Sequence, residues 1–422
     1  MKMHAINKHL VLSIGALSIA AAFQSAWAAE LKAGDIINAA NIDKVKNDTF
    51  EGHSVASMIT EKMEFMIKNY SMSVKLRRSE ELPINQIDID NTKKYASEVK
   101  FDAATNEVTG YKAGLPFPNI DAADSKAGHK LLYNNYYLNT TGSSFDGAYT
   151  FLFINAEKGV ERNQSWHTTT LKMKGRSGPQ PVVGDGELVN KQLLFATAPF
   201  DIKGIGIFTL RHDNAKLEDN WAYIKSVRRT RQLSGGSWMD NMAGGVQLND
   251  EYDIFSARPS WFPDAKLIGK RWVLAVPHLK LPIVDASKKG TPEEFPTVDL
   301  QTKPFWNAKV DYEPREVYVV EVTMPKEHPY GKRIMYMDTK FPRFYMTEHY
   351  DKSGQFVKMQ QVFSAPSKGG DGYNGMLPWQ GHTYDLKRKE GFIYLAAPGA
   401  MINRVGLKPD DVTLGKLEAA AK

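Results

Sequence analysis

Aromatic and β-branched residues dominate a stretch that reads Trp221-Ala-Tyr-Ile-Lys-Ser-Val-Arg-Arg-Thr-Arg231 and, after a loop, Lys266-Leu-Ile-Gly-Lys-Arg-Trp-Val-Leu-Ala-Val276. Such residues favour β-strands, so we expect a strand at each end. The loop, Ser234-Gly-Gly-Ser-Trp-Met-Asp-Asn-Met-Ala-Gly-Gly245, has a glycine pair near each end, and an acidic aromatic segment, 249–255, follows it. A mobile apolar loop between two aromatic strands is typical of the mouth of a hydrophobic binding site rather than of a catalytic centre.

Short strand patterns recur on both sides of this stretch. Turn signals such as Asp213-Asn214 and Asp351-Lys-Ser-Gly354 separate them, and no helical pattern intervenes. We therefore expect one large antiparallel sheet or open barrel. Residues 82–90, which include Pro83, are expected to be a loop or an edge, and the Asp88-Ile-Asp90 pair to be solvated. The expected strands are 149–154, 165–174, 192–199, 204–211, 221–232, 266–276, 315–323, 332–338, 343–350, 355–363 and one within 383–395.

One amphipathic helix is expected over residues 54–69. The preceding Asp48-Thr-Phe-Glu51 has the form of a capping box, and apolar residues then recur at helical spacing. This stripe includes Met58, Met63 and Met66. The favoured interpretation is that the stripe simply covers the sheet, and the alternative is that its methionines line a deformable ligand cavity. Shorter helices are expected within 125–139 and 410–421.

The first 28 residues have the form of a cleaved signal peptide. Lys2 and Lys8 precede the apolar run 10–23, and Ala26-Trp-Ala28 provides a small-x-small cleavage site. We expect a single mature domain over 29–422, located in the periplasm. The sequence contains no cysteine, which excludes disulfides, thiolate metal sites and a lipid anchor on cysteine.

No familiar catalytic or cofactor motif is present. Histidines after residue 28 are never within four residues of one another, so paired-histidine metal spacing is absent. There is no Gly-x-Ser-x-Gly elbow, phosphate loop or dinucleotide fingerprint. We expect no cofactor, no metal and no enzymatic activity, although acid pairs assembled only in space leave a hydrolase open. The formal net charge of +6 falls to +4 without Lys2 and Lys8, and we expect no nucleic-acid binding.

The densest basic patch comprises Arg228, Arg229 and Arg231. It is either a charged strand edge or an anion clamp at the mouth of the cavity. Trp238 lies in a polar, glycine-flanked loop, so we expect it to be an exposed contact residue. The arginines are the candidates for binding an anionic head group. The candidates for the hydrophobic cavity and its lid are Met58, Met63, Met66, Phe117, Trp221, Tyr223, Trp238, Met242 and Trp272.

Three segments together resemble a known family. They are Gly114-Leu-Pro-Phe-Pro118, the Trp221-x-Tyr-x-x-x-x-Arg-Arg-x-Arg231 tract and Leu267-Ile-Gly-Lys270. The chain resembles a proteobacterial periplasmic family of unknown function whose members are often labelled outer membrane lipoprotein-sorting proteins. The resemblance implies a fold similar to the lipoprotein carriers LolA and LolB. It also implies that the protein is encoded beside an inner-membrane exporter of the resistance-nodulation-division type and an outer-membrane protein, which are therefore expected partners. It supplies no catalytic residues.

These observations together predict an α+β protein. Its core is a single large curved antiparallel sheet, an open half-barrel, with the 54–69 helix packed on its concave face. The predicted function is a periplasmic carrier or accessory protein that binds a lipid or other hydrophobic molecule. The alternatives are a transporter adaptor that carries nothing and a periplasmic hydrolase with a spatially assembled acid-base site.

Overall fold

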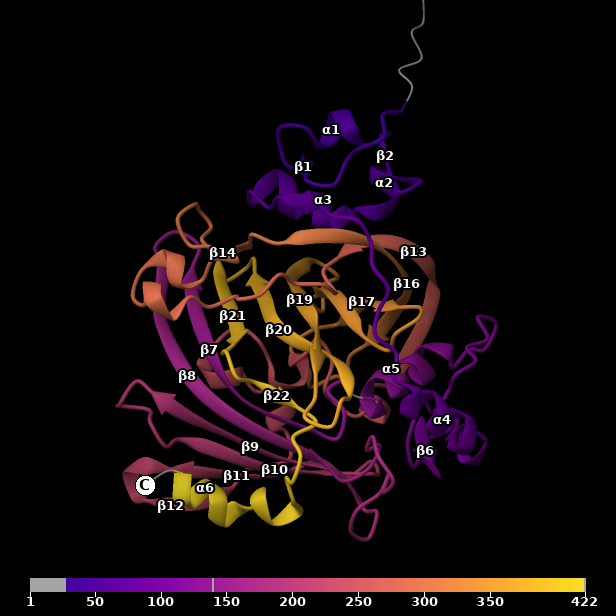
Figure 1. Ribbon diagram of the computed structural model, residues 1–422, viewed down its shortest axis with the longest axis vertical. Helices are drawn as coiled ribbons and strands as arrows, with labels where there is room; N and C mark the ends of the chain where they lie inside the picture. The colour runs from indigo at the N-terminus through magenta and orange to yellow at the C-terminus, as the bar shows by residue number, and fades with distance from the viewer. Residues whose placement is uncertain (1–27, 139, 421–422) are drawn as a thin grey trace, which may run out of the picture.

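The fold is an open, strongly curved sheet with few helices, seen in a computed structural model that describes residues 28–138 and 140–420. In Figure 1 the strands bend from β13 (Asp264–Ala275) and β16 (Asp311–Thr323) at the top to β9 (Leu188–Ala198) and its neighbours at the bottom. This confirms the predicted α+β class and the open, mostly antiparallel sheet. The predicted signal sequence up to residue 27 lies outside the described residues. Within them, no helix is long and apolar enough to cross a membrane.

Sixteen strands form the large sheet, in the order β1-β4-β16-β17-β18-β19-β20-β21-β7-β8-β9-β10-β11-β12, with β13 beside β16 and β22 beside β7. All pairings are antiparallel except β4 with β16. The other strands of this sheet are β1 (Ile36–Ile37), β4 (Val74–Leu76), β7 (Ser144–Asn155), β8 (Gly159–Lys172), β10 (Gly206–His212), β11 (Asp219–Ile224), β12 (Arg229–Gln232), β17 (Lys332–Asp338), β18 (Phe344–Tyr350), β19 (Phe356–Lys368), β20 (Asn374–Asp385), β21 (Glu390–Ala396) and β22 (Met401–Ile402).

Two of the expected strands are hairpins. Residues 221–232 divide into β11 and β12, because the chain turns through a short 3-10 segment that ends at Arg228 with φ 48°. The single strand expected within 383–395 is the end of β20 paired with β21. Small hairpins outside the main sheet are β2 (Thr49–Phe50) with β3 (His53–Ser54), β5 (Lys100–Asp102) with β6 (Glu107–Thr109), and β14 (Val298–Asp299) with β15 (Asn307–Ala308).

The helix expected over 54–69 is two helices, α2 (Val55–Met58) and α3 (Glu61–Asn69). The break occurs at Thr60, whose extended backbone and side chain cap α3 by accepting a hydrogen bond from the amide of Met63. The expected capping box at 48–51 is wrong, since these residues enter the β2–β3 hairpin and Ser54 caps α2 instead. The other α-helices are α1 (Ile42–Val45), α4 (Gln86–Tyr95), α5 (Ala127–Tyr137) and α6 (Leu414–Ala420).

Helix α4 replaces the loop or edge strand expected over 82–90. Pro83 precedes the helix and therefore does not interrupt its hydrogen bonds. Asp88 is not solvated as expected, because the hydroxyl of Tyr373 donates a hydrogen bond of 2.9 Å to its carboxylate. Burial raises the pKa of Asp88, and the Tyr373 hydrogen bond opposes that rise.

Both faces of the sheet are covered, and alternate residues of β7 belong to different cores. Leu152 and Ile154 point to what we call the α3 face, which packs against α2, α3 and the segment after β13. Phe151 and Phe153 point to the α5 face, which packs against α5 and residues 238–262. Helix α6 covers the α3 face further along, at β9 and β10. The two faces therefore carry separate cores.

Candidate functional site

A cavity of about 350 Å³ lies on the α5 face, between the strands from β7 to β11 and residues 233–256. The period of two along each strand directs every second side chain into it. The aromatic wall comes from β7, and neighbouring strands add mostly polar side chains. The strand residues that line the cavity include Phe145, Tyr149 and Phe151 on β7; Thr168, Thr170 and Lys172 on β8; Asn190, Gln192 and Leu194 on β9; and Ile207, Thr209 and Arg211 on β10.

The segment after β12 closes the opposite wall of the cavity. Asn220 of β11 accepts a hydrogen bond of 2.6 Å from Thr209 and donates one of 2.7 Å to the hydroxyl of Ser237. Met242 and Tyr252 of the same segment also line the cavity. The glycine-rich loop is therefore attached to the sheet next to the cavity, as part of its wall.

Lys172 is the most unusual group in the lining. Its side chain is buried, and its Nζ donates to the backbone carbonyl of Tyr137. It forms no ion pair with any carboxylate of the described residues. Burial lowers the pKa of Lys172 to about 7; the charge of Asp88 opposes this effect, and that of Arg176 adds to it. A buried ammonium group without a counter-ion thus borders the cavity.

The two arginines of the lining already have acidic partners. The Nε of Arg211 donates a hydrogen bond of 2.6 Å to Glu218. Arg343, which is also buried, pairs with Asp253 and donates a hydrogen bond of 2.8 Å from its Nε to the hydroxyl of Ser364. Burial raises the pKa of Asp253, while the charge of Arg343 opposes the rise. These arginines are therefore neutralised within the protein.

Of the expected cavity residues, Met242 lines the cavity and Trp238 does not. The expectation that Trp238 is exposed is wrong, because only 6% of it is accessible. Its ring packs 5.4 Å from that of Trp261 and 5.7 Å from that of Phe262. The loop lies on the α5 face of the sheet, which gives this indole a core to join.

The other expected cavity residues lie elsewhere in the fold. Met58, Met63 and Met66 are fully buried on the α3 face, so the stripe covers the sheet and does not line this cavity. Trp272 stacks on His53 at 3.8 Å on that side, and Phe117 packs beside the tyrosines of α5. Trp221 and Tyr223 belong to the core under α6.

The basic patch is likewise remote from the cavity lining. Arg228, Arg229 and Arg231 are exposed on or beside β12, the last strand of the sheet. The neighbouring Thr230 donates a hydrogen bond of 3.0 Å to Glu418 of α6. This arrangement agrees with a charged strand edge, which disfavours pairing with another sheet.

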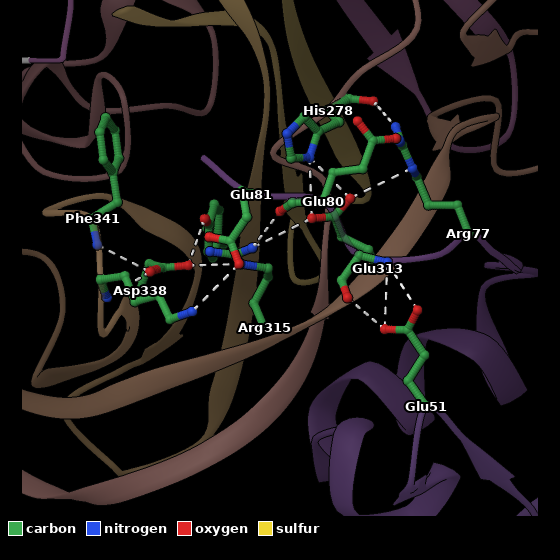
Figure 2. A network of polar contacts seen from close by, with 12 residues as sticks. Glu51, Arg77, Glu80, Glu81, His278, Glu313, Arg315, Asp338 and Phe341 are labelled. Carbon is green, nitrogen blue, oxygen red and sulfur yellow. Dashed lines mark hydrogen bonds and ion pairs between the residues drawn. The ribbon is translucent and has the colours of Figure 1, made fainter. Parts of the chain in front are cut away.

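A second polar cluster joins the segment after β4 to the sheet (Figure 2). The buried carboxylate of Glu313 lies 3.0 Å from Nδ1 of His278 and 3.5 Å from Nε of Arg77. Arg315 lies 3.6 Å from Glu313 and donates a hydrogen bond of 2.8 Å to Asp338. Opposite charges are thus matched, as in a structural network. In the described part of the chain, no group of three or more potential ligands could hold a metal ion.

A third polar cluster anchors the segment 246–255 on the α5 face. Arg333 of β17 donates a hydrogen bond of 2.7 Å to Asp250, and Lys358 of β19 lies 3.3 Å from Glu251. His349 of β18 is buried beside them, and burial lowers its pKa well below the usual value. All of these charged groups are inaccessible, so they hold the cavity wall rather than face a ligand.

Apart from Met242, the residues that form the cavity were not predicted from the sequence. The run Thr168-Thr-Thr-Leu-Lys172 did contain a signal, since alternate positions placed a lysine on the same face as two threonines. That face could be assigned to a cavity only once the loop after β12 was known to lie above it.

One family model matches most of the chain. A family model described as "Protein of unknown function (DUF1329)" matches residues 36–401. This match confirms the resemblance found in the sequence. No curated protein matches the chain.

The solved structures that match the chain share little sequence with it. A DUF1329 family protein from Desulfovibrio piger has 16% identity and a TM-score of 0.48, covering 69% of this chain and 98% of its own. A putative outer membrane lipoprotein-sorting protein domain from Vibrio parahaemolyticus has 14% identity and a TM-score of 0.46, with 70% and 100% covered. A LolA superfamily protein from Nitrosomonas europaea has 14% identity and a TM-score of 0.40, with 68% and 98% covered.

Proposed function

We propose, from the premise that this chain belongs to the DUF1329 family of proteins of unknown function, that it is a periplasmic carrier of one small hydrophobic or amphipathic molecule. The cavity on the α5 face is the observation that carries the proposal. Its aromatic wall would bind the apolar part of the ligand, and burial of that part would contribute roughly 25 cal/mol per Å². Its polar strand residues would bind the other end.

The size of the cavity restricts the ligand. Sites for small molecules commonly measure about 300–1,000 Å³. At about 350 Å³ the cavity is near the lower end of that range. We therefore propose a ligand with a single chain or a compact ring system, rather than a lipid with several long acyl chains.

The alternative functions have less support. An adaptor that carries nothing is expected to have a filled interior on both faces of its sheet, whereas the α5 face leaves a cavity. A hydrolase needs an acid-base pair in its cleft. No histidine of the described residues lines this cavity, and two of its carboxylates, Glu218 and Asp253, are paired with Arg211 and Arg343. Partnership with an inner-membrane exporter and an outer-membrane protein remains part of the proposal, on the strength of the family resemblance.

The test begins with protein purified gently from its native host. Native mass spectrometry followed by organic extraction should reveal a co-purifying amphiphile at near-stoichiometric amount. Leu194→Trp would fill the cavity, while Phe195→Trp alters the opposite face of the same strand and serves as the matched control. We expect the first variant to lose the ligand and the second to keep it. A ligand retained equally by both variants, or absent from the wild type, would contradict the proposal.

A further inference from the structure

We infer that the molecule bound in the cavity is an acid, and that its anionic group pairs with Lys172. This inference rests on the proposed carrier function and adds the chemical class of the ligand. It differs from the expectation drawn from the sequence, which gave the anionic head group to Arg228, Arg229 and Arg231. Those arginines do not line the cavity, whereas Lys172 does.

Among the described residues, Lys172 has few hydrogen-bond partners. An ammonium group has three N–H donors. In the described chain, the carbonyl of Tyr137 is the hydrogen-bond acceptor of its Nζ. Just 3% of Lys172 is exposed, so water outside the cavity does not solvate the remaining donors. These donors can be satisfied from within the cavity that the residue lines.

The charge of Lys172 also lacks compensation. A buried charge is costly unless it is paired. Asp88 favours the charged form through space, but it forms no ion pair with Lys172, and the nearby Arg176 opposes it. A carboxylate or phosphate brought by a ligand would supply both the counter-charge and the missing acceptors. Binding of an acid would therefore stabilise the ammonium group that burial disfavours.

The other cations of the lining are poorer candidates. Glu218 already neutralises Arg211, and Asp253 already neutralises Arg343. A ligand acid at either arginine would share the guanidinium charge with a carboxylate of the protein. Lys172 requires no such sharing.

The experiment compares ligands that differ only in the head group. Isothermal titration calorimetry on delipidated protein lacking residues 1–28 would use dodecanoic acid, dodecyl phosphate and 1-dodecanol. We expect both anions to bind at least about tenfold more tightly than the alcohol, as one charge-assisted hydrogen bond provides. The relative affinities of the two anions would identify carboxylate or phosphate as the preferred head group.

Two lysine variants test the residue assignment. Lys172→Met should remove the preference for anions, so that the acid, the phosphate and the alcohol bind with similar affinities. Lys191→Met is the control, because Lys191 alternates with the cavity residues Asn190 and Gln192 and so points away from the cavity. It should behave as the wild type.

The outcomes separate this inference from the proposed function. Equal affinities of the wild type for acid and alcohol would overturn the acidic ligand but keep the carrier. A preference for anions that survives in Lys172→Met would overturn the role of Lys172. Failure of all three probes to bind the wild type would overturn both the inference and the proposed carrier of single-chain amphiphiles. The comparison within the wild type holds even if the variant does not fold.

Discussion

The guanidinium of Arg333 and the carboxylate of Asp250 form a hydrogen bond of 2.7 Å, and both side chains are completely inaccessible. The pair connects β17 to the segment that forms one wall of the cavity. Arg333→Met would leave Asp250 and Glu251 with less positive charge nearby. We expect it to lower the free energy of unfolding by about 3–5 kcal/mol, the usual cost of breaking a buried ion pair from one side.

Chemical denaturation at neutral pH would measure this cost. The double variant Arg333→Met/Asp250→Asn should recover part of the loss, because the second substitution removes the unpaired charge. Lys332→Met is a neighbouring control, since it removes only a partly exposed pair with Glu321 and should change stability by less than about 1 kcal/mol. A similar small effect for Arg333→Met would refute the anchoring role.

Lys172 predicts a stability that depends on pH. Burial lowers its pKa to about 7 in the folded chain, from an ordinary value near 10.5. The folded protein therefore holds less of this proton than the unfolded chain between these pH values, and stability rises with pH across that window. Below about pH 7 Lys172 is charged in both states, and the full free-energy cost of burying that charge then lowers the stability of the folded protein. Lys172→Met removes this cost and should stabilise the ligand-free protein by about 2–4 kcal/mol at pH 6.

The difference between the variant and the wild type is the quantity to measure. In thermal or chemical unfolding at several pH values, the difference in the free energy of unfolding should shrink from pH 7 upward and nearly vanish above about pH 10.5. Asp88 and Arg176, the charged groups that influence Lys172, are kept in both proteins, although the Lys172 charge in turn lowers the pKa of Asp88. A difference independent of pH would mean that Lys172 does not titrate in this range.

The capping of α3 by Thr60 predicts a smaller effect. Its hydroxyl accepts a hydrogen bond of 3.0 Å from the amide of Met63. Thr60→Ala should therefore lower the free energy of unfolding by about 0.5–2 kcal/mol, whereas Thr60→Ser should cost less because it keeps the acceptor. Equal costs for the two variants in denaturant titrations would show that the cap does not contribute.

The strands were predictable from sequence because the alternation of apolar and polar residues and the turn residues between strands depend only on neighbouring positions in the chain. Residues 332–338, for example, were expected as a strand and form β17. The division of 221–232 was not predictable in this way, since Arg228 closes the turn at a positive φ that arginine rarely adopts. Helix α4 was missed because its hydrophobic pattern is weak and its packing depends on distant contacts such as that of Asp88 with Tyr373.

The cavity itself depends on contacts between distant parts of the chain. The sequence placed Met242 in an apolar loop beside a binding site, and that residue lines the cavity. It could not show that the loop covers β7 to β11, because Arg333 and Asp250 are 83 residues apart and their pairing has no local pattern. For the same reason Trp238 was expected to be exposed, and the three helix methionines stayed candidates for a site although packing on the sheet was the favoured interpretation.

The glycine-rich loop was expected to be mobile, but the packing of Gly245 at its end predicts that this glycine does not act as a hinge. A Cβ atom on Gly245 would lie 2.4 Å from the Phe392 ring, a distance that real Cβ atoms do not adopt. Its φ of −88° is open to any residue, so close packing rather than backbone freedom requires glycine. Gly245→Ala should therefore lower the free energy of unfolding by about 1–3 kcal/mol.

Gly236 provides the matched control at the other end of the loop. A Cβ there meets nothing within 4 Å, and its φ of −83° suits alanine. Gly236→Ala should leave stability unchanged or raise it by about 0.4–1 kcal/mol, because it restricts the unfolded chain. Denaturation of the two variants side by side tests the contrast. A Gly245→Ala variant of unchanged stability but slower ligand exchange would show that Gly245 acts as a hinge. Its close packing against Phe392 would then not be what holds the loop on the sheet.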